Sequence, residues 1–231
     1  SMEKIKQLLR KGADETSFDV VIVGSGMAGL STACILTSKG LKVLVLEANY
    51  LPGGCSSSYY RQGYYFESGA TTLVGLDEHM PLQHLLAQLQ LDLPAVKLSL
   101  PMQVHLGGKT INRYQNLKNW ILEAERVFGP NGQRAFWTKA YEVSQLVWRN
   151  SIKQLSFPPS SVGDLLQMAK HASLSQFKSL PYAFGTIEDW LVQFGLISNE
   201  AFVRFIDAQL MITAQNTHQE VNQLFGAAAL C

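Results

Sequence analysis

Three glycines near the start of the chain follow a run of mainly β-branched residues. The run covers residues 18–23, and the glycines are Gly24, Gly26 and Gly29. When a buried strand ends in a G-x-G-x-x-G turn that opens a helix, free backbone N–H groups and the positive end of the helix dipole meet at one point. This arrangement binds the pyrophosphate of a dinucleotide. We expect the phosphates to approach Gly26 and the helix to pack closely on the strand at Gly29.

An acidic residue stands where such a site needs one. Residues 42–46 form a second buried apolar run, and Glu47 ends it, about 20 residues after the first glycine. A carboxylate there accepts hydrogen bonds from ribose hydroxyls and repels a 2′-phosphate, which argues against NADP. Between the two runs, residues 28–38 carry small side chains and end at Lys39 and Gly40, a helix stop. The segment therefore predicts one βαβ unit whose strands are buried on both faces.

Two further motifs follow Glu47. Gly53 and Gly54 form a pair followed by Cys55, and residues 63–69 read Gly-Tyr-Tyr-Phe-Glu-Ser-Gly. Together with the turn, these motifs resemble the FAD-dependent phytoene desaturase, carotenoid isomerase and retinol saturase group, within the amine-oxidase-like flavoproteins. The resemblance is specific from residue 18 to about residue 75 and loose beyond it. In that family the second motif brings the chain back to the flavin.

The resemblance implies FAD as the cofactor. Residues without a Cβ, or with a small side chain, let the backbone pass against a diphosphate or a flat ring. The residues assigned to FAD binding by the turn and the resemblance are Gly24, Ser25, Gly26, Met27, Ala28, Gly29, Glu47, Ala48, Gly53, Gly54, Cys55, Gly69, Ala70 and Thr71. No catalytic acid or base is assigned, because in such chemistry the flavin carries the difficult step.

The implied reaction is hydride exchange between flavin N5 and a C–H or C=C bond of an apolar, polyene-like substrate of the carotenoid or retinoid type. Desaturation, saturation and isomerisation all fit. Amine oxidases of this superfamily usually have an Arg after the Gly-Gly pair, where this chain has Cys55. An amine or amino-acid oxidase of the same fold remains an alternative, as does a non-catalytic FAD-binding subunit or fragment.

The composition narrows the choice of partner and compartment. The 231 residues include 19 Lys and Arg against 18 Asp and Glu, so no basic surface points to nucleic acid. Charged residues are only 16%, which suits an apolar small-molecule substrate and contact with a membrane surface. No run is long enough for a spanning helix. The 3 cysteines are too few for a disulfide framework, which favours the cytoplasm, and the histidines lack metal-ligand spacing. We expect Cys34 in the core and Cys55 as a small buried residue.

The fold class is α/β, with a Rossmann-like FAD-binding βαβ unit in residues 17–76 and a mostly helical substrate or membrane-facing region in residues 77–231. A lead-in helix is expected at residues 3–11, and a small hairpin at residues 102–106 and 109–114. One helix is predicted to start at Pro81, and another to present Leu117, Trp120, Ile121 and Ala124 on one face and to stop at Gly129 and Pro130. Capping boxes at Thr186 and Thr217 predict two more. The aromatic residues after Leu117 pack a core or, in part, line a substrate channel.

The chain is also expected to be incomplete relative to the family. The family has a late segment near the flavin that nothing after Leu76 resembles. The sequence therefore suggests the N-terminal half of such an enzyme. A βαβ unit with one face of its sheet uncovered exposes apolar surface and a strand edge. We expect self-association or a C-terminal partner segment that covers this surface.

Overall fold

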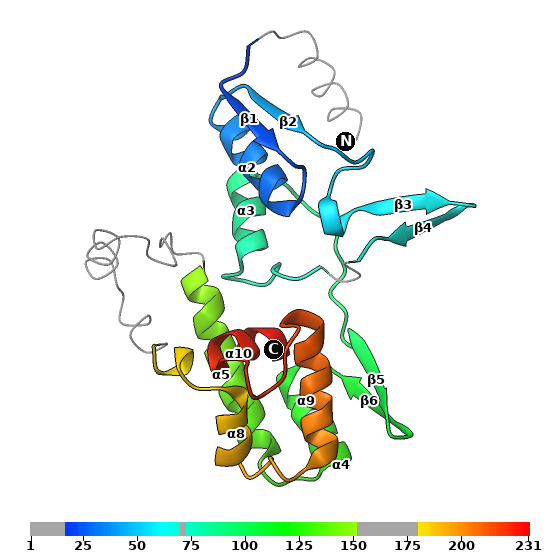
Figure 1. The fold of residues 1–231 in the computed structure, drawn as a ribbon, viewed down its shortest axis with the longest axis vertical. Helices are drawn as coiled ribbons and strands as arrows, with labels where there is room; N and C mark the ends of the chain where they lie inside the picture. The colour runs from blue at the N-terminus through cyan, green and yellow to red at the C-terminus, as the bar shows by residue number, and fades with distance from the viewer. Residues whose placement is uncertain (1–16, 70–72, 152–179) are drawn as a thin grey trace. The chain divides into compact units, whose positions relative to one another are not determined.

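The computed structural model describes residues 17–69, 73–151 and 180–231. Two compact units make up the chain (Figure 1), the first from residues 1–78 and 82–93 and the second from residues 79–81 and 94–231. The boundary predicted between residues 76 and 77 stays a prediction, and the contacts group residues 82–93 with the first unit. The expected helix at residues 3–11 and the predicted site residues Ala70 and Thr71 lie outside the described residues.

The first unit contains the predicted βαβ unit. Strand β1 (Val20–Val23) and strand β2 (Val43–Leu46) pair in parallel, and helix α2 (Met27–Ser38) connects them. Side chains alternate along β1, so that Val21 and Val23 are 51% and 86% exposed. The prediction of a strand buried on both faces is therefore wrong for the described residues. The expected exposure of apolar surface on the sheet is confirmed.

Helix α2 turns one small side chain inward. Ala33 is buried, whereas Cys34 is exposed. The prediction that Cys34 lies in the core is wrong, because neighbouring residues of a helix point about 100° apart. Once Ala33 takes the buried position, the next side chain is turned away. The predicted stop is confirmed, since the N–H of Gly40 bonds to the carbonyl of Thr37 at 2.9 Å.

Two antiparallel hairpins follow along the chain. Strands β3 (Ser58–Arg61) and β4 (Tyr64–Glu67) turn at Gln62 and Gly63, whose φ angles are 50° and 89°. This hairpin was not predicted, although a turn with two positive φ angles suits the aromatic β-formers on either side of it. Strands β5 (Met102–Leu106) and β6 (Lys109–Arg113) confirm the predicted hairpin across Gly107 and Gly108.

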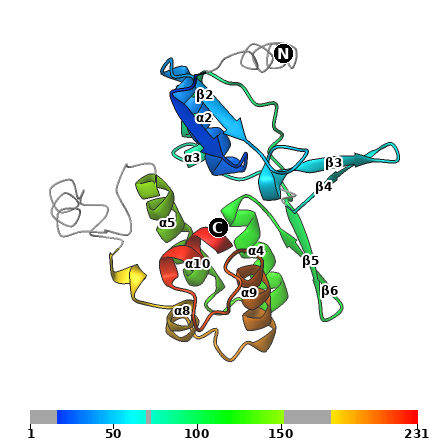
Figure 2. The ribbon, with the colours of Figure 1, turned by 45° about the horizontal axis from the view of Figure 1, so that its top comes forward.

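Helices make up most of the described residues after the second hairpin, and a further helix lies between the two hairpins along the chain. Helix α3 (Pro81–Leu89) confirms the predicted start at Pro81. The second unit contains α4 (Leu117–Phe128), α5 (Gln133–Ser151), the 3₁₀ turn η3 (Leu180–Ala183), α8 (Ile187–Gln193), α9 (Glu200–Thr213) and α10 (Gln223–Leu230). Helix α10 contacts both α5 and α9, and Figure 2 shows it between them. The second unit is thus a helical layer with the β5–β6 hairpin against α4.

Aromatic side chains fill the core of the second unit. Trp120, Phe136, Trp137, Phe202 and Phe205 are all 0% exposed. Their rings meet edge to face or tilted, as in the pair of Trp120 and Trp137, whose centroids lie 5.0 Å apart. These residues therefore serve as core, which was one of the two alternatives for the aromatic set.

One predicted helix start is confirmed and one is wrong. Helix α8 begins after Thr186, whose N–H bonds to the Asp189 carboxylate at 2.8 Å. The predicted start at Thr217 does not exist. Helix α10 begins only after Asn222, whose side-chain oxygen accepts from the N–H of Phe225 at 2.9 Å. The chain before it is held by the start of α8, because the carbonyl of Val221 accepts from the Ile187 N–H.

A buried carboxylate joins α4 to the β5–β6 hairpin. Glu123 is 7% exposed and accepts the backbone N–H of Asn112 in β6 at 2.9 Å. Arg126 donates to both of its oxygens at 2.7 Å. These hydrogen bonds, with the one from Arg126 largest, outweigh burial and lower the pKa of Glu123 from its ordinary value. The ionised form therefore stabilises the fold.

We expect Glu123→Gln to lower the free energy of unfolding at pH 7 by about 1.5–3 kcal/mol, because it removes charge-assisted hydrogen bonds. The folded-state pKa is lowered, so this stabilisation is present above the ordinary carboxyl pKa and is lost as pH falls through the folded value. Urea unfolding between pH 3 and 7 measures the effect. Glu125→Gln, on the same helix with a surface ion pair to Arg134, is the control. An equal decrease in the free energy of unfolding of the two variants would contradict the prediction.

Candidate dinucleotide site

The turn between β1 and α2 has an open helix end. Gly24 has a φ of +99° and its N–H bonds to the carbonyl of Leu46 at 2.7 Å. Gly26 is the N-cap of α2, in extended conformation, and no side chain caps the helix there. The N–H groups of the first turn are therefore available to a ligand with negative charge.

Two glycines of this turn have opposite surroundings. A Cβ on Gly29 would overlap the carbonyl oxygen of Gly24 and lie 3.4 Å from Cγ2 of Ile22. A Cβ on Gly26 would meet nothing within 4 Å. Gly29 thus serves the packing of α2 on β1, whereas Gly26 borders open space. That is the division of roles that the spacing predicts for a dinucleotide turn.

Glu47 is held against the turn by hydrogen bonds. Its Oε2 accepts from the backbone N–H of Ser25 at 2.7 Å and from the Ser25 hydroxyl at 2.5 Å. Its Oε1 accepts from the N–H of Asn49 at 2.8 Å. The Ser25 hydroxyl first, and then the Asn49 and Ser25 amides, lower the pKa of Glu47 to about 2. The carboxylate is therefore ionised at neutral pH.

The Gly-Gly pair lies directly on the turn. The N–H of Gly53 bonds to the carbonyl of Ser25 at 2.8 Å. Gly53 and Gly26 also form an isolated parallel β-bridge. Gly53 and Gly54 have φ angles of +114° and +59°. A Cβ on Gly54 would lie 3.3 Å from Cα of Gly26. Both the backbone conformation and this close approach require glycine.

The end of β4 returns to the same loop. The N–H of Ser68 bonds to the carbonyl of Ser57 at 2.9 Å, and their hydroxyls lie 3.0 Å apart. A Cβ on Gly69 would lie 3.2 Å from the carbonyl oxygen of Cys55. Cys55 itself is exposed, so the prediction of a buried small residue is wrong. It lies in the 3₁₀ turn η2 (Gly54–Ser56), none of whose residues is buried.

The structure therefore brings together four segments that the sequence singled out. They are the turn at residues 24–29, Glu47, the loop at residues 53–55, and Gly69. The predicted residues Met27, Ala28 and Ala48 are exposed beside the first two segments. Sequence reasoning included Ser25 only as part of the turn and missed the bond from its hydroxyl to Glu47. A hydroxyl residue inside the turn, about 20 positions before an acidic residue, is the sequence signal that could have indicated this bond.

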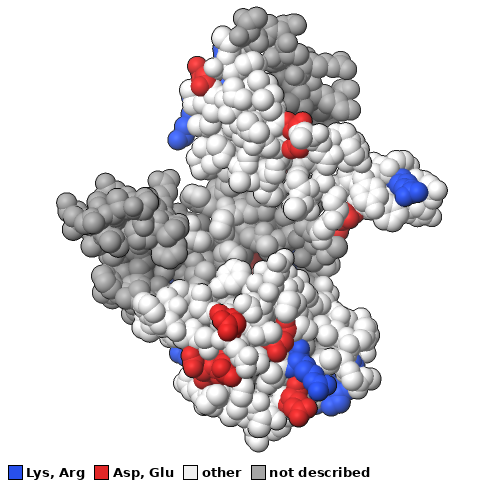
Figure 3. Space-filling view, viewed as in Figure 1, with Lys and Arg blue, Asp and Glu red and all other residues white. Residues whose placement is uncertain are grey.

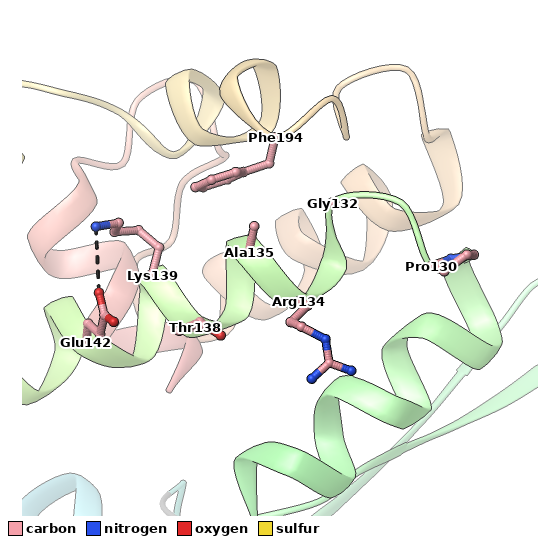
Figure 4. Close-up of a pocket in the computed structure, with 8 residues that line it drawn as sticks. All are labelled: Pro130, Gly132, Arg134, Ala135, Thr138, Lys139, Glu142 and Phe194. Atoms are coloured by element: carbon pink, nitrogen blue, oxygen red, sulfur yellow. Dashed lines mark ion pairs between the residues drawn. The ribbon is translucent and has the colours of Figure 1, made fainter.

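The described part of the second unit offers no comparable site. A hollow beside the first turns of α5 is bordered by Gly132, Thr138 and Phe194 (Figure 4). Its charged residues are already paired, Lys139 with Glu142 at 3.6 Å and Arg134 with Glu125 at 3.3 Å. Lys, Arg, Asp and Glu cover only small areas of the face seen in Figure 3. Among the described residues no His, Cys, Asp or Glu cluster suits a metal ion, and no helix could cross a membrane.

Comparison with known proteins finds similarities for the first unit and for longer parts of the chain. Residues 22–89 match the family model of the NAD(P)-binding Rossmann-like domain. All-trans-retinol 13,14-reductase of Danio rerio is 32% identical over 161 residues, which are 64% of this chain and 25% of that protein. Prolycopene isomerase 2 of an Oncidium hybrid cultivar is 24% identical over 227 residues, 96% of this chain and 38% of that protein. These matches confirm the resemblance to the carotenoid isomerase and retinol saturase group that the sequence motifs indicated.

Other matches concern amine chemistry. The L-amino-acid oxidase of Naja atra is 43% identical, but only over 75 residues, 31% of this chain and 15% of that protein. A solved structure of a putrescine oxidase mutant redesigned in its cofactor binding has a TM-score of 0.52 and 15% identity. The superposition covers 91% of this chain and 40% of the putrescine oxidase chain. At this low identity the similarity shows the fold alone. The chain spans 25% to 40% of the length of the retinol, prolycopene and putrescine proteins.

We expect Gly29→Ala to lower the free energy of unfolding by about 1–3 kcal/mol or more, because the added methyl overlaps a backbone oxygen that cannot move without separating α2 from β1. Gly26→Ala should lower it by less than about 1 kcal/mol, the effect of a poorer N-cap. Chemical denaturation of the two variants measures the difference. Equal stability of the two proteins would contradict the close packing described for Gly29.

Proposed function

We propose that the first unit binds the ADP part of FAD and that the protein is an FAD-dependent oxidoreductase. The observation that carries the proposal is the convergence of the Gly-Gly pair and Glu47 on the open turn at Gly26. A Rossmann-like turn alone suits several dinucleotides. The added Gly-Gly contact, together with relatives that are flavoproteins, favours FAD.

The residues present fit such a ligand. The uncapped N-terminus of α2 and the open space at Gly26 would hold the pyrophosphate. Glu47, ionised at neutral pH, would accept hydrogen bonds from the adenosine ribose. Its negative charge would repel a 2′-phosphate, which supports FAD over NADP. The glycines at positions 53, 54 and 69 would let backbone lie against the cofactor.

FAD, when bound, supplies hydride exchange at flavin N5. The described residues of this chain have a different task in the proposal. The α2 terminus binds the phosphates, Glu47 orients the ribose, and the loop at residues 53–55 limits the space around the pyrophosphate. We assign no proton transfer to any residue of the chain, because the described site contains no acid or base other than Glu47 in contact with the turn.

We further propose an apolar, polyene-like substrate of the carotenoid or retinoid type. The first unit ends by residue 93, so matches of 161 and 227 residues with the retinol reductase and the prolycopene isomerase extend into the second unit. A charged content of only 16% suits such a substrate. Its delivery from a lipid phase by contact with a membrane surface, in a protein of the cytoplasm, belongs to the same proposal.

An amine or amino-acid oxidase is the second candidate. The 43% identity with the L-amino-acid oxidase supports it. That match covers 75 residues, fewer than the first unit contains, and the dinucleotide fold is shared by enzymes with many substrates. Cys55 also stands where amine oxidases usually have an Arg. We therefore prefer the polyene-like substrate to the amine or amino-acid substrate.

The cofactor assignment predicts that Gly26→Val abolishes FAD binding while the protein stays folded, because the side chain fills the open space meant for the pyrophosphate. Glu47→Ala should raise the Kd for FAD at least about tenfold, since a charged acceptor is lost. Titration of the apoprotein, followed by quenching of flavin fluorescence, measures both. Thr32→Val, an exposed position further along α2, is the control. Wild-type affinity in Gly26→Val would remove the turn from the cofactor site.

The substrate assignment predicts that the flavin-loaded protein converts a polyene and not a primary amine. All-trans-retinol and a cis-carotene in detergent micelles serve as apolar probes, and putrescine and an L-amino acid as amine probes. Chromatography of the products detects saturation, desaturation and isomerisation, and the flavin spectrum under anaerobic conditions detects net reduction. Reduction by an amine, with every polyene unchanged, would reverse the ranking of the two candidates.

A further inference from the structure

Ser25 uses all of its polar atoms inside the candidate site. Its N–H and its hydroxyl both donate to Oε2 of Glu47, at 2.7 Å and 2.5 Å. Its carbonyl accepts from the N–H of Gly53 at 2.8 Å. Ser25 itself is 3% exposed, whereas Glu47 is exposed, so these contacts lie at the edge of the solvent. One residue, through its backbone and its hydroxyl, thus connects the turn, the acidic residue at the end of β2, and the Gly-Gly pair.

We propose that Ser25 is a positioning residue for the dinucleotide, whose hydroxyl fixes the Glu47 carboxylate as the acceptor for the adenosine ribose. This inference rests on the proposed function. Ser25 acts through Glu47 and the loop at residues 53–55 rather than by contact with the reacting atoms.

The hydrogen-bond pattern leaves room for a ribose on Glu47. Oε2 accepts two hydrogen bonds from Ser25, whereas Oε1 accepts one, from the Asn49 N–H. A carboxylate has about four acceptor directions, so Oε1 keeps one for a ribose hydroxyl. Because the carboxylate is already held in one orientation, the ligand does not have to order it on binding. Such preorganisation improves affinity without any new contact.

The charge of Glu47 depends on the same contacts. The Ser25 hydroxyl is the largest cause that lowers the pKa of Glu47, followed by the Asn49 and Ser25 amides, with a smaller one from the Ala48 amide. These causes are N–H and O–H groups, three of which form the hydrogen bonds described above, and no charged side chain contributes. Removal of the hydroxyl should therefore bring the pKa up from about 2 toward the ordinary value of 4.5.

The test compares Ser25→Ala with Ser38→Ala in the purified protein. Ser38 lies at the other end of α2, where its hydroxyl bonds to the carbonyl of Ile35 at 2.8 Å, so the control removes the same chemical group. NMR titration of the Glu47 side-chain carboxyl in the FAD-free protein gives the pKa. Fluorescence titration with FAD at pH 7 gives the Kd. Thermal melts verify that the variants are folded.

We expect Ser25→Ala to raise the pKa of Glu47 and to increase the Kd for FAD about three- to tenfold, the effect of one hydrogen bond. Ser38→Ala should change neither, and Ser25→Thr, which keeps the hydroxyl, should restore both. An unchanged Kd in Ser25→Ala, with or without a shifted pKa, would overturn the positioning role and leave the proposed function intact. A wild-type protein that binds no FAD would overturn the proposed function and the inference together.

Discussion

The candidate site depends on the close approach of helix α2 to strand β1. A side chain at Gly29 would overlap the carbonyl oxygen of Gly24, so the helix can begin this near the strand only because Gly29 has no Cβ. This approach sets the position of the uncapped first turn of α2 beside the end of β2, where Glu47 lies. The anion-binding end of the helix and the carboxylate are therefore placed by one steric constraint.

Hydrogen bonds of the backbone and of short polar side chains, rather than a large core, assemble the rest of the site. Among its described residues, the first unit has a parallel sheet of two strands, and Val21 and Val23 of its β1 are exposed. Its loops are joined by the bonds of Ser25 to Glu47 and Gly53, and by the bonds between Ser57 and Ser68. The second unit has its own aromatic core around Trp120 and Trp137. Self-association, or coverage of the exposed sheet by a further segment, stays a prediction.

Features with a strong local cause could be predicted from the sequence. The G-x-G-x-x-G turn, the helix start at Pro81 and the hairpin at Gly107 depend on neighbouring residues alone. The predictions failed where the structure of a segment depends on contacts that its own sequence does not reveal. Thr217 has a suitable capping sequence, but bonds to the start of α8 hold the following residues out of a helix. Cys34 was misplaced because periodicity alone did not fix which neighbour on α2 faces the sheet, and the bond from Ser25 to Glu47 needs the folded turn.

A crystal structure of the protein grown with FAD tests the central claim most directly. The account predicts a pyrophosphate at the N-terminus of α2 beside Gly26, with the adenosine ribose within hydrogen-bonding distance of Glu47. The Ser25 hydroxyl should remain bonded to that carboxylate. An FAD molecule bound away from the turn, or a turn that remains empty when FAD saturates the protein, would contradict the account.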